Sequence, residues 1–104
     1  MYVLILFREG PRFGEIGLDE EAHEAFVTTL IKRNLVLLGG DFGEAIDRVH
    51  AAYVLRCASI DEALGVAAED PAFVNGVFEP HAVEWDLVGV NTDAIDETVT
   101  PRDV

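Results

Sequence analysis

Two runs of apolar residues early in the chain contain no polar position. They span Tyr2 to Phe7 and Leu35 to Leu38, and the first includes β-branched and aromatic residues. Such runs are typical of strands that are buried on both faces. A third strand is predicted at Ala51 to Ala58 and a fourth at Val77 to Val88, whose later part alternates between apolar and polar residues.

The apolar residues between these runs follow helical spacing in two segments. Asp19 precedes two glutamates and a stripe of apolar residues at three- and four-residue spacing up to Asn34, which predicts the first helix. Ser59 begins a capping box, in which the hydroxyl meets the amide of Glu62 and the Glu62 carboxylate returns to the amide of the cap. The second helix should end at or just before Asp70, because the proline that follows cannot continue its hydrogen bonds.

Asp70 has two interpretations, which the sequence leaves open. Because Pro71 follows it and Gly76 lies further on, Asp70 fits the cap of a short helix from Pro71 to Asn75. This is the commoner role for such a residue. Alternatively, Asp70 is a functional carboxylate at the end of a helix, and the two roles are compatible.

The order strand, helix, strand, strand, helix, strand predicts an α+β fold. It is the ferredoxin-like βαββαβ unit, with an antiparallel four-stranded sheet and both helices on one face. Because the first two strands are apolar on both sides, the other face also needs a cover, and a second copy of the chain is the economical one. We therefore expect a homodimeric α/β barrel, with Trp85 near the interface. Residues 1–90 form the predicted domain and residues 91–104 an acidic tail.

Composition excludes several classes of function. The 104 residues include 20 acidic and 7 basic ones, and a net charge of -13 repels nucleic acid and anionic membranes. No apolar run approaches the roughly 18 residues that span a bilayer. The chain begins with a strand rather than a leader, so a cytoplasmic location is expected. The single cysteine, Cys57, excludes an intrachain disulfide and a cysteine-based metal site.

The predicted topology brings the start of the first helix and the end of the second to one edge of the sheet. His23 and Asp70 meet there, and such a pair suits general acid/base chemistry because the carboxylate fixes the imidazole tautomer. Arg48, His50 and the Gly-rich loop from Glu9 to Gly17 lie at the same edge, the loop being either a lid or a plain connection. The candidate substrate-binding residues are Arg8, Gly39, Gly40 and Phe73.

Other kinds of site are less well supported by the residues. Ser59 belongs to the opposite end of the second helix, so no nucleophile accompanies the pair and proton transfer is favoured over acyl transfer. A metal site built from His23, His50 and His81 lacks the close paired spacing of a ligand motif. No Gly-rich dinucleotide fingerprint or basic phosphate cluster is present, so no cofactor is expected.

Five short motifs, in order and spacing, resemble the YCII-related family, which is YciI-like and belongs to the dimeric α/β-barrel superfamily. They lie within roughly residues 1–88: Glu-Ala-His-Glu-Ala-Phe around His23, Leu-Leu-Gly-Gly-Asp-Phe at 37–42, Ser-Ile-Asp-Glu-Ala at 59–63, Glu-Asp-Pro-Ala-Phe at 69–73 and Val-Glu-Trp at 83–85. The resemblance implies a dimeric barrel with a His-Asp active site at His23 and Asp70. Asp41 replaces the usual proline of the second motif, and the Gly-rich loop is longer than in the family pattern.

The resemblance implies chemistry similar to that of dehydrochlorinases or muconolactone isomerases. The leading hypothesis is therefore a cofactor-independent lyase or isomerase acting on a small organic molecule, with His23 as general acid or base and Asp70 orienting it. The alternative is a non-catalytic homodimer that binds a small ligand or a protein partner. A haem- or flavin-dependent monooxygenase in the same kind of barrel is a third class, which the missing fingerprint disfavours.

Overall fold

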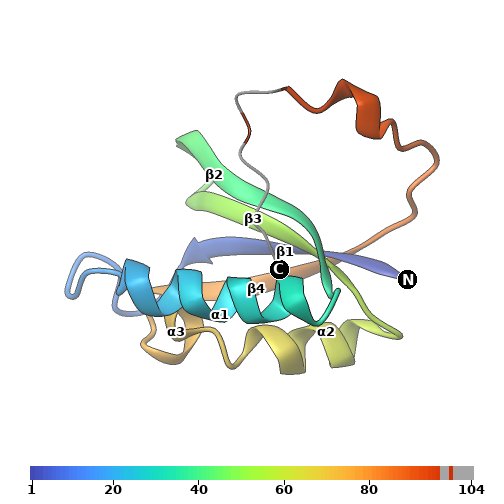
Figure 1. Ribbon diagram of the computed structural model, residues 1–104. Coiled ribbons are helices and arrows are strands. Elements are labelled where there is room, and N and C mark those ends of the chain that lie inside the picture. The colour runs from blue at the N-terminus through green and yellow to red at the C-terminus, as the bar shows by residue number, and fades with distance from the viewer. Residues whose placement is uncertain (97–98, 100–104) are drawn as a thin grey trace.

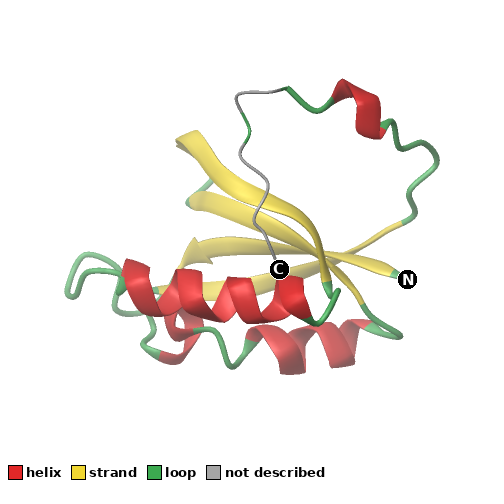
Figure 2. Cartoon of the chain, in the orientation of Figure 1, coloured by secondary structure: helices red, strands yellow, loops and turns green. Residues whose placement is uncertain are grey.

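The computed structural model describes residues 1–96 and 99. Its elements follow the predicted order, the short helix considered after Asp70 is present before the last strand, and a 3-10 turn follows that strand (Figures 1 and 2). They are β1 (Tyr2–Glu9), α1 (Glu20–Lys32), β2 (Val36–Ile46), β3 (Val49–Arg56), α2 (Ile60–Ala67), α3 (Pro71–Val74), β4 (Phe78–Trp85) and the 3-10 turn η1 (Thr92–Ala94). The α+β ferredoxin-like fold is thus confirmed.

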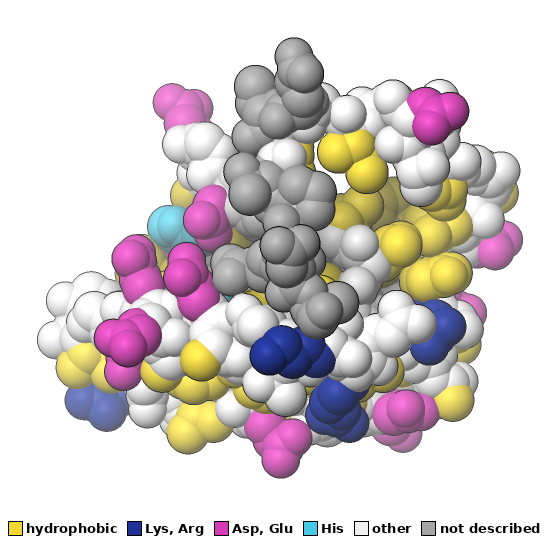
Figure 3. Space-filling model, viewed as in Figure 1, with side chains coloured by type: hydrophobic (Ala, Val, Ile, Leu, Met, Phe, Trp, Pro, Cys, Tyr) yellow, Lys and Arg dark blue, Asp and Glu magenta, His cyan; other side chains and the backbone are white. Residues whose placement is uncertain are grey.

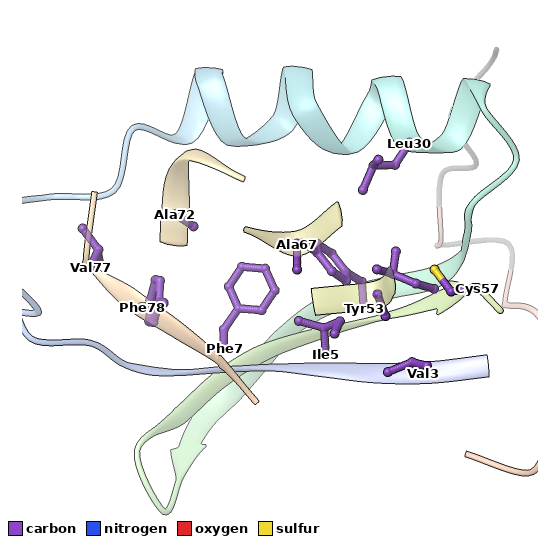
Figure 4. Packing of buried hydrophobic residues seen from close by; sticks show 12 residues of the cluster. Val3, Ile5, Phe7, Leu30, Tyr53, Cys57, Ala67, Ala72, Val77 and Phe78 are labelled. Carbon is purple, nitrogen blue, oxygen red and sulfur yellow. The ribbon is translucent and has the colours of Figure 1, made fainter. Parts of the chain in front are cut away.

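The sheet has the strand order β2-β3-β1-β4, and every neighbouring pair is antiparallel. The helices α1, α2 and α3 lie on one face of the sheet (Figure 2). Alternate residues of β1, namely Val3, Ile5 and Phe7, point into this helix layer, where Leu30 of α1 packs toward them (Figure 4). The core therefore lies between the sheet and the helices.

The opposite face of the sheet carries apolar side chains that no helix covers. Leu4 pairs with Val83 and Tyr2 with Trp85 on this outer face. Val83 is 40% exposed, Trp85 is 45% exposed, and Leu38 on β2 is 61% exposed. Hydrophobic side chains gather in the hollow between the helix layer and the segment that follows β4 (Figure 3). The prediction that Leu35 to Leu38 is buried on both faces is wrong for the single chain.

The predicted helix caps are present, with one difference. The Asp19 carboxylate accepts a hydrogen bond from the Ala22 amide at 3.1 Å, and the Ser59 hydroxyl accepts one from the Glu62 amide at 3.0 Å. The Glu62 carboxylate, however, accepts from the amide of Ala58 at 3.1 Å rather than from that of the cap residue. Both caps fix the direction in which the chain enters its helix.

The polar and glycine residues from Asp41 to Val49 predict a polar turn, but the segment is mostly strand. β2 continues to Ile46 because it pairs with β3, and the turn is reduced to Asp47 and Arg48. Both residues have positive φ angles, 50° and 66°, as the two-residue turns that match the twist of a hairpin require. The two glycines at Gly39-Gly40 permit either a tight bend or the close approach of a ligand, and the bend is not formed, since both lie inside β2.

The fourth strand is shorter than predicted and ends at Trp85. Among the described residues β4 pairs with β1 alone, and Trp85 pairs with Tyr2 at the start of that strand, so β1 offers no further backbone to the residues after Trp85. Residues 91–96 are exposed. Of the charges predicted for the acidic tail, those of Glu97, Arg102 and Asp103 lie outside the described residues. In the described part of the chain, no helix is long and apolar enough to cross a membrane.

Candidate functional site

Asp70 is a fully buried carboxylate held by three hydrogen-bond donors. One oxygen accepts from the Ala72 amide at 3.0 Å, which makes Asp70 the cap of α3. The other accepts from the Tyr53 hydroxyl at 3.2 Å, and His23 Nδ1 approaches both oxygens, at 2.8 and 3.0 Å. The geometry confirms Asp70 as a helix cap and also places it in contact with His23, and its functional role stays a prediction. Burying a carboxylate is costly unless donors of this kind surround it.

His23 lies on the first turns of α1, and its side chain is 19% exposed. Its ring packs edge-on against Phe7, with centroids 5.4 Å apart. Because Nδ1 donates to Asp70, the opposite nitrogen, Nε2, carries the free lone pair of the neutral imidazole. Nε2 has no hydrogen-bond partner among the described residues.

The network shifts two pKa values upward. The hydrogen bond to Asp70 raises the pKa of His23 despite partial burial, and the charges of Asp70 and Asp41 act in the same direction. Burial raises the pKa of Tyr53 well above its usual value, and the Asp70 charge adds to this. Tyr53 therefore keeps its proton and serves as a permanent donor to Asp70, while His23 can gain and lose a proton.

We expect an Asp70→Asn substitution to lower the pKa of His23, because it removes the charged acceptor while keeping the shape of the side chain. NMR titration of the imidazole signals measures this pKa, and His81 on the outer face of β4 provides a control signal. The raised pKa also makes the pair stabilising below about pH 6.5, the ordinary value, and this contribution is lost as the pH rises through the folded-state pKa. An unchanged pKa of His23 in the variant would show that the two groups are not coupled.

His23 forms part of the wall of a groove of about 760 Å³ between α1 and the β2-β3 hairpin. Phe7 and Tyr53 contribute the sheet side and Ile95 comes from the segment after β4. Gly39 also lines it, and a Cβ atom at this position would lie 2.7 Å from Cβ of Tyr53. Only glycine therefore allows β2 to approach β3 so closely here. The close approach of a ligand to Gly39-Gly40 stays a prediction.

Apart from two histidines, the charged side chains of the described residues that line the groove are carboxylates. Three carboxylates, from Glu20, Glu24 and Asp41, share the lining with His23 and His50, and no Lys or Arg of the described residues does. On the face shown in Figure 3, acidic side chains group around the exposed histidine atoms, whereas the Lys and Arg side chains lie elsewhere. The field in the groove therefore favours neutral or cationic ligands over anions.

The predicted substrate-binding residues lie in three different places. Gly39 and Gly40 line the groove. Phe73 packs behind it, with its ring centroid 4.6 Å from that of Phe7. Arg8 is exposed and follows Phe7 on β1, so it points to the outer face, away from the groove. Binding roles for these residues stay predictions.

Sequence reasoning missed Tyr53, which contacts Asp70 directly. The signal was its hydroxyl in an otherwise apolar strand, because a buried tyrosine usually finds a hydrogen-bond partner. The three histidines do not form one cluster: His81 pairs with Leu6 on the outer face, whereas His23, on α1, packs against Phe7 on the inner face of the sheet. Within residues 1–96 and 99, no group of three His, Cys, Asp or Glu side chains is arranged to hold a metal ion.

No family model and no curated protein matches this chain. Among solved structures, the chain is similar to 5-chloro-2-hydroxyhydroquinone dehydrochlorinase (TftG) from Burkholderia phenoliruptrix AC1100, in complex with 2,5-dihydroxybenzoquinone. The sequences are 22% identical, the TM-score is 0.63, and the match covers 83% of this chain and 94% of the other. At this identity the likeness shows the fold. Membership of the YCII-related family stays a prediction.

Proposed function

We propose that this protein is a cofactor-independent enzyme of the lyase or isomerase type, with His23 as its general base. One observation carries the proposal: His23 Nδ1 lies 2.8 Å from the buried Asp70 carboxylate while its ring lines a groove large enough for a small molecule. The structural likeness to a dehydrochlorinase supports the same class of reaction. Asp70 is the positioning residue and Tyr53 holds it in place.

In the proposed reaction on a chlorohydroquinone, the substrate reacts as its keto tautomer, in which a hydroxyl proton has moved to the carbon that carries chlorine and made it saturated. The lone pair of His23 Nε2 takes a proton from a remaining O–H bond, the electron pair of that bond forms a new C=O bond and shifts the ring double bonds, and chloride departs from the saturated carbon with its bonding pair. Asp70 stabilises the imidazolium, which then gives its proton to water. The net reaction is the loss of HCl from the substrate, and it requires no oxidant. In an isomerase, the same proton would return to a different carbon.

The charge of the groove narrows the substrate class. The carboxylates of Glu20, Glu24 and Asp41, with no lining Lys or Arg in the described part of the chain, disfavour substrates that carry a carboxylate or phosphate. Its wall also contains apolar and aromatic side chains, such as Val27 and Phe7. A small neutral ring with hydroxyl groups and a leaving group, such as a chlorinated hydroquinone, fits this environment.

We expect the wild-type protein to release chloride from 5-chloro-2-hydroxyhydroquinone under nitrogen, faster than the spontaneous reaction. A carboxylate-bearing chlorohydroquinone should bind at least about tenfold more weakly, because like charges repel across the groove. A chloride electrode measures turnover, and calorimetry measures binding. Absence of both turnover and binding across a panel of neutral chlorinated phenols would contradict the proposal.

The second candidate is a homodimeric module that binds a ligand or a protein without catalysis. One observation favours it: Asp70 caps α3 and accepts the Tyr53 hydroxyl, so its burial has a structural explanation. This candidate predicts that the protein binds a ligand without releasing chloride. It also predicts that binding does not depend on the protonation state of His23.

A further inference from the structure

A second histidine reaches the groove from an irregular point in the sheet. Phe7 of β1 pairs with Ala51 of β3, but the next residue, Arg8, pairs with Val49. His50 is therefore an extra residue in β3, a β-bulge, and bulges redirect side chains and are common next to active sites. This bulge brings His50 Nε2 to 2.9 Å from a carboxylate oxygen of Glu9 at the end of β1.

Aromatic rings hold His50 in this position. Its ring centroid lies 4.9 Å from that of Phe13, in the Gly-rich loop, and 5.5 Å from that of Phe78. Phe78 is in turn 5.8 Å from Phe7, and Figure 4 shows these two rings side by side. Since Phe7 also packs against His23, the two histidines flank an aromatic centre and both line the groove.

The two histidines are oriented through opposite ring nitrogens. His23 uses Nδ1 to contact Asp70, whereas His50 uses Nε2 to contact Glu9. When neutral, His50 therefore donates through Nε2–H and keeps the lone pair of Nδ1 free. Its side chain is 31% exposed and lines the groove, and Nδ1 has no hydrogen-bond partner among the described residues.

We infer that His50, positioned by Glu9, is a second substrate-binding residue, which accepts a hydrogen bond through Nδ1 from a substrate hydroxyl remote from the atom deprotonated by His23. The inference rests on the proposed function and narrows its substrate. The substrate should be a ring that carries polar groups on two sides, with an apolar face between them that packs against Phe7. It also gives the Gly-rich loop a part in binding, because Phe13 of that loop contacts His50.

Two substitutions separate a substrate contact from a structural role. In His50→Asn the amide lies near the position of Nδ1, and the hydrogen bond to Glu9 is lost. In His50→Gln the amide reaches the position of Nε2, and the hydrogen bond to Glu9 is kept. If Nδ1 binds the substrate, we expect His50→Gln to weaken binding of 2-hydroxyhydroquinone about tenfold and His50→Asn to weaken it less. For 5-chloro-2-hydroxyhydroquinone, KM should rise in the same order with kcat little changed, since the contact is equal in ground and transition states.

The outcomes distinguish this inference from the proposed function. If wild-type protein releases chloride but both variants bind the probe as tightly as wild type does, the contact from His50 is wrong and the proposed function stands. Tighter binding by His50→Gln than by His50→Asn would also overturn the contact, because it would assign His50 the structural role of holding Glu9. If the wild type binds neither compound, both proposals fall.

Discussion

A His23→Asn substitution is expected to lower kcat for chloride release by about 10²- to 10⁴-fold, the usual contribution of a positioned general base. Asparagine places its amide near the position of Nδ1, so a donor to the buried Asp70 remains and the fold should be kept. It has no counterpart of the basic Nε2. The expected loss is therefore one of chemistry rather than of structure.

The matched control is the same substitution at His81. This residue lies on the outer face of β4, pairs with Leu6 and is exposed, so His81→Asn should leave kcat unchanged. Circular dichroism and thermal unfolding establish that both variants are folded. A His23→Asn protein that is folded and as active as wild type would exclude His23 as the base.

The pH dependence of kcat/KM gives a separate check on the role of His23. Only the neutral imidazole can accept a proton, so the rate should rise with pH and level off above the raised pKa of His23. Replacing Asp70 with asparagine should move this rise to lower pH and lower the plateau, because the imidazolium loses its charged partner. A rate that falls over the same range would instead identify His23 as a general acid.

The fold was predictable because its signals are local. Apolar runs predicted β1 and β3. The caps at Asp19 and Ser59 predicted where α1 and α2 begin, and Pro71 predicted that α2 ends before it. The order of these elements then determined the topology. The extension of β2 to Ile46 was missed because its polar residues are kept in a strand by pairing with β3, which is a non-local interaction.

The candidate site was predictable only in part, for the same reason. The meeting of His23 and Asp70 follows from element order, since topology alone brings the two helix ends together. The Tyr53 contact depends on which buried donor a carboxylate finds. The topology also places His50 at this edge, but its contact with Glu9 depends on a bulge, which is a property of strand register and leaves no mark in the local sequence.

We expect a second copy of the chain to cover the outer face of the sheet. The outer face of the sheet carries Leu4, Val83 and Trp85, and residues 88–96, which follow β4, are exposed. Soluble monomers rarely leave an apolar patch of more than a few hundred Å² in water. A second copy is the simplest cover, because a two-fold axis places the same apolar face against itself. We therefore expect light scattering at micromolar concentration to give at least twice the 11.4 kDa of one chain.

A Val83→Lys substitution should shift the protein to the monomer. Val83 is 40% exposed in the single chain, so lysine is accommodated there without disturbing the core. In a two-fold interface the substitution occurs twice, and each ammonium group would have to be buried without a partner, which costs several kcal/mol. Val74→Lys is the matched control, since Val74 is 65% exposed on α3 at the other side of the molecule and should leave the dimer intact.

The single tryptophan makes the same equilibrium visible without a label. Trp85 is 45% exposed on the outer face, so burial against a partner should shift its fluorescence to shorter wavelength as the concentration rises. The Val83→Lys protein should keep the emission of an exposed indole at all concentrations, whereas Val74→Lys should follow the wild type. A wild-type protein that scatters as a monomer, with emission independent of concentration, would contradict both the dimer and the barrel that it would form.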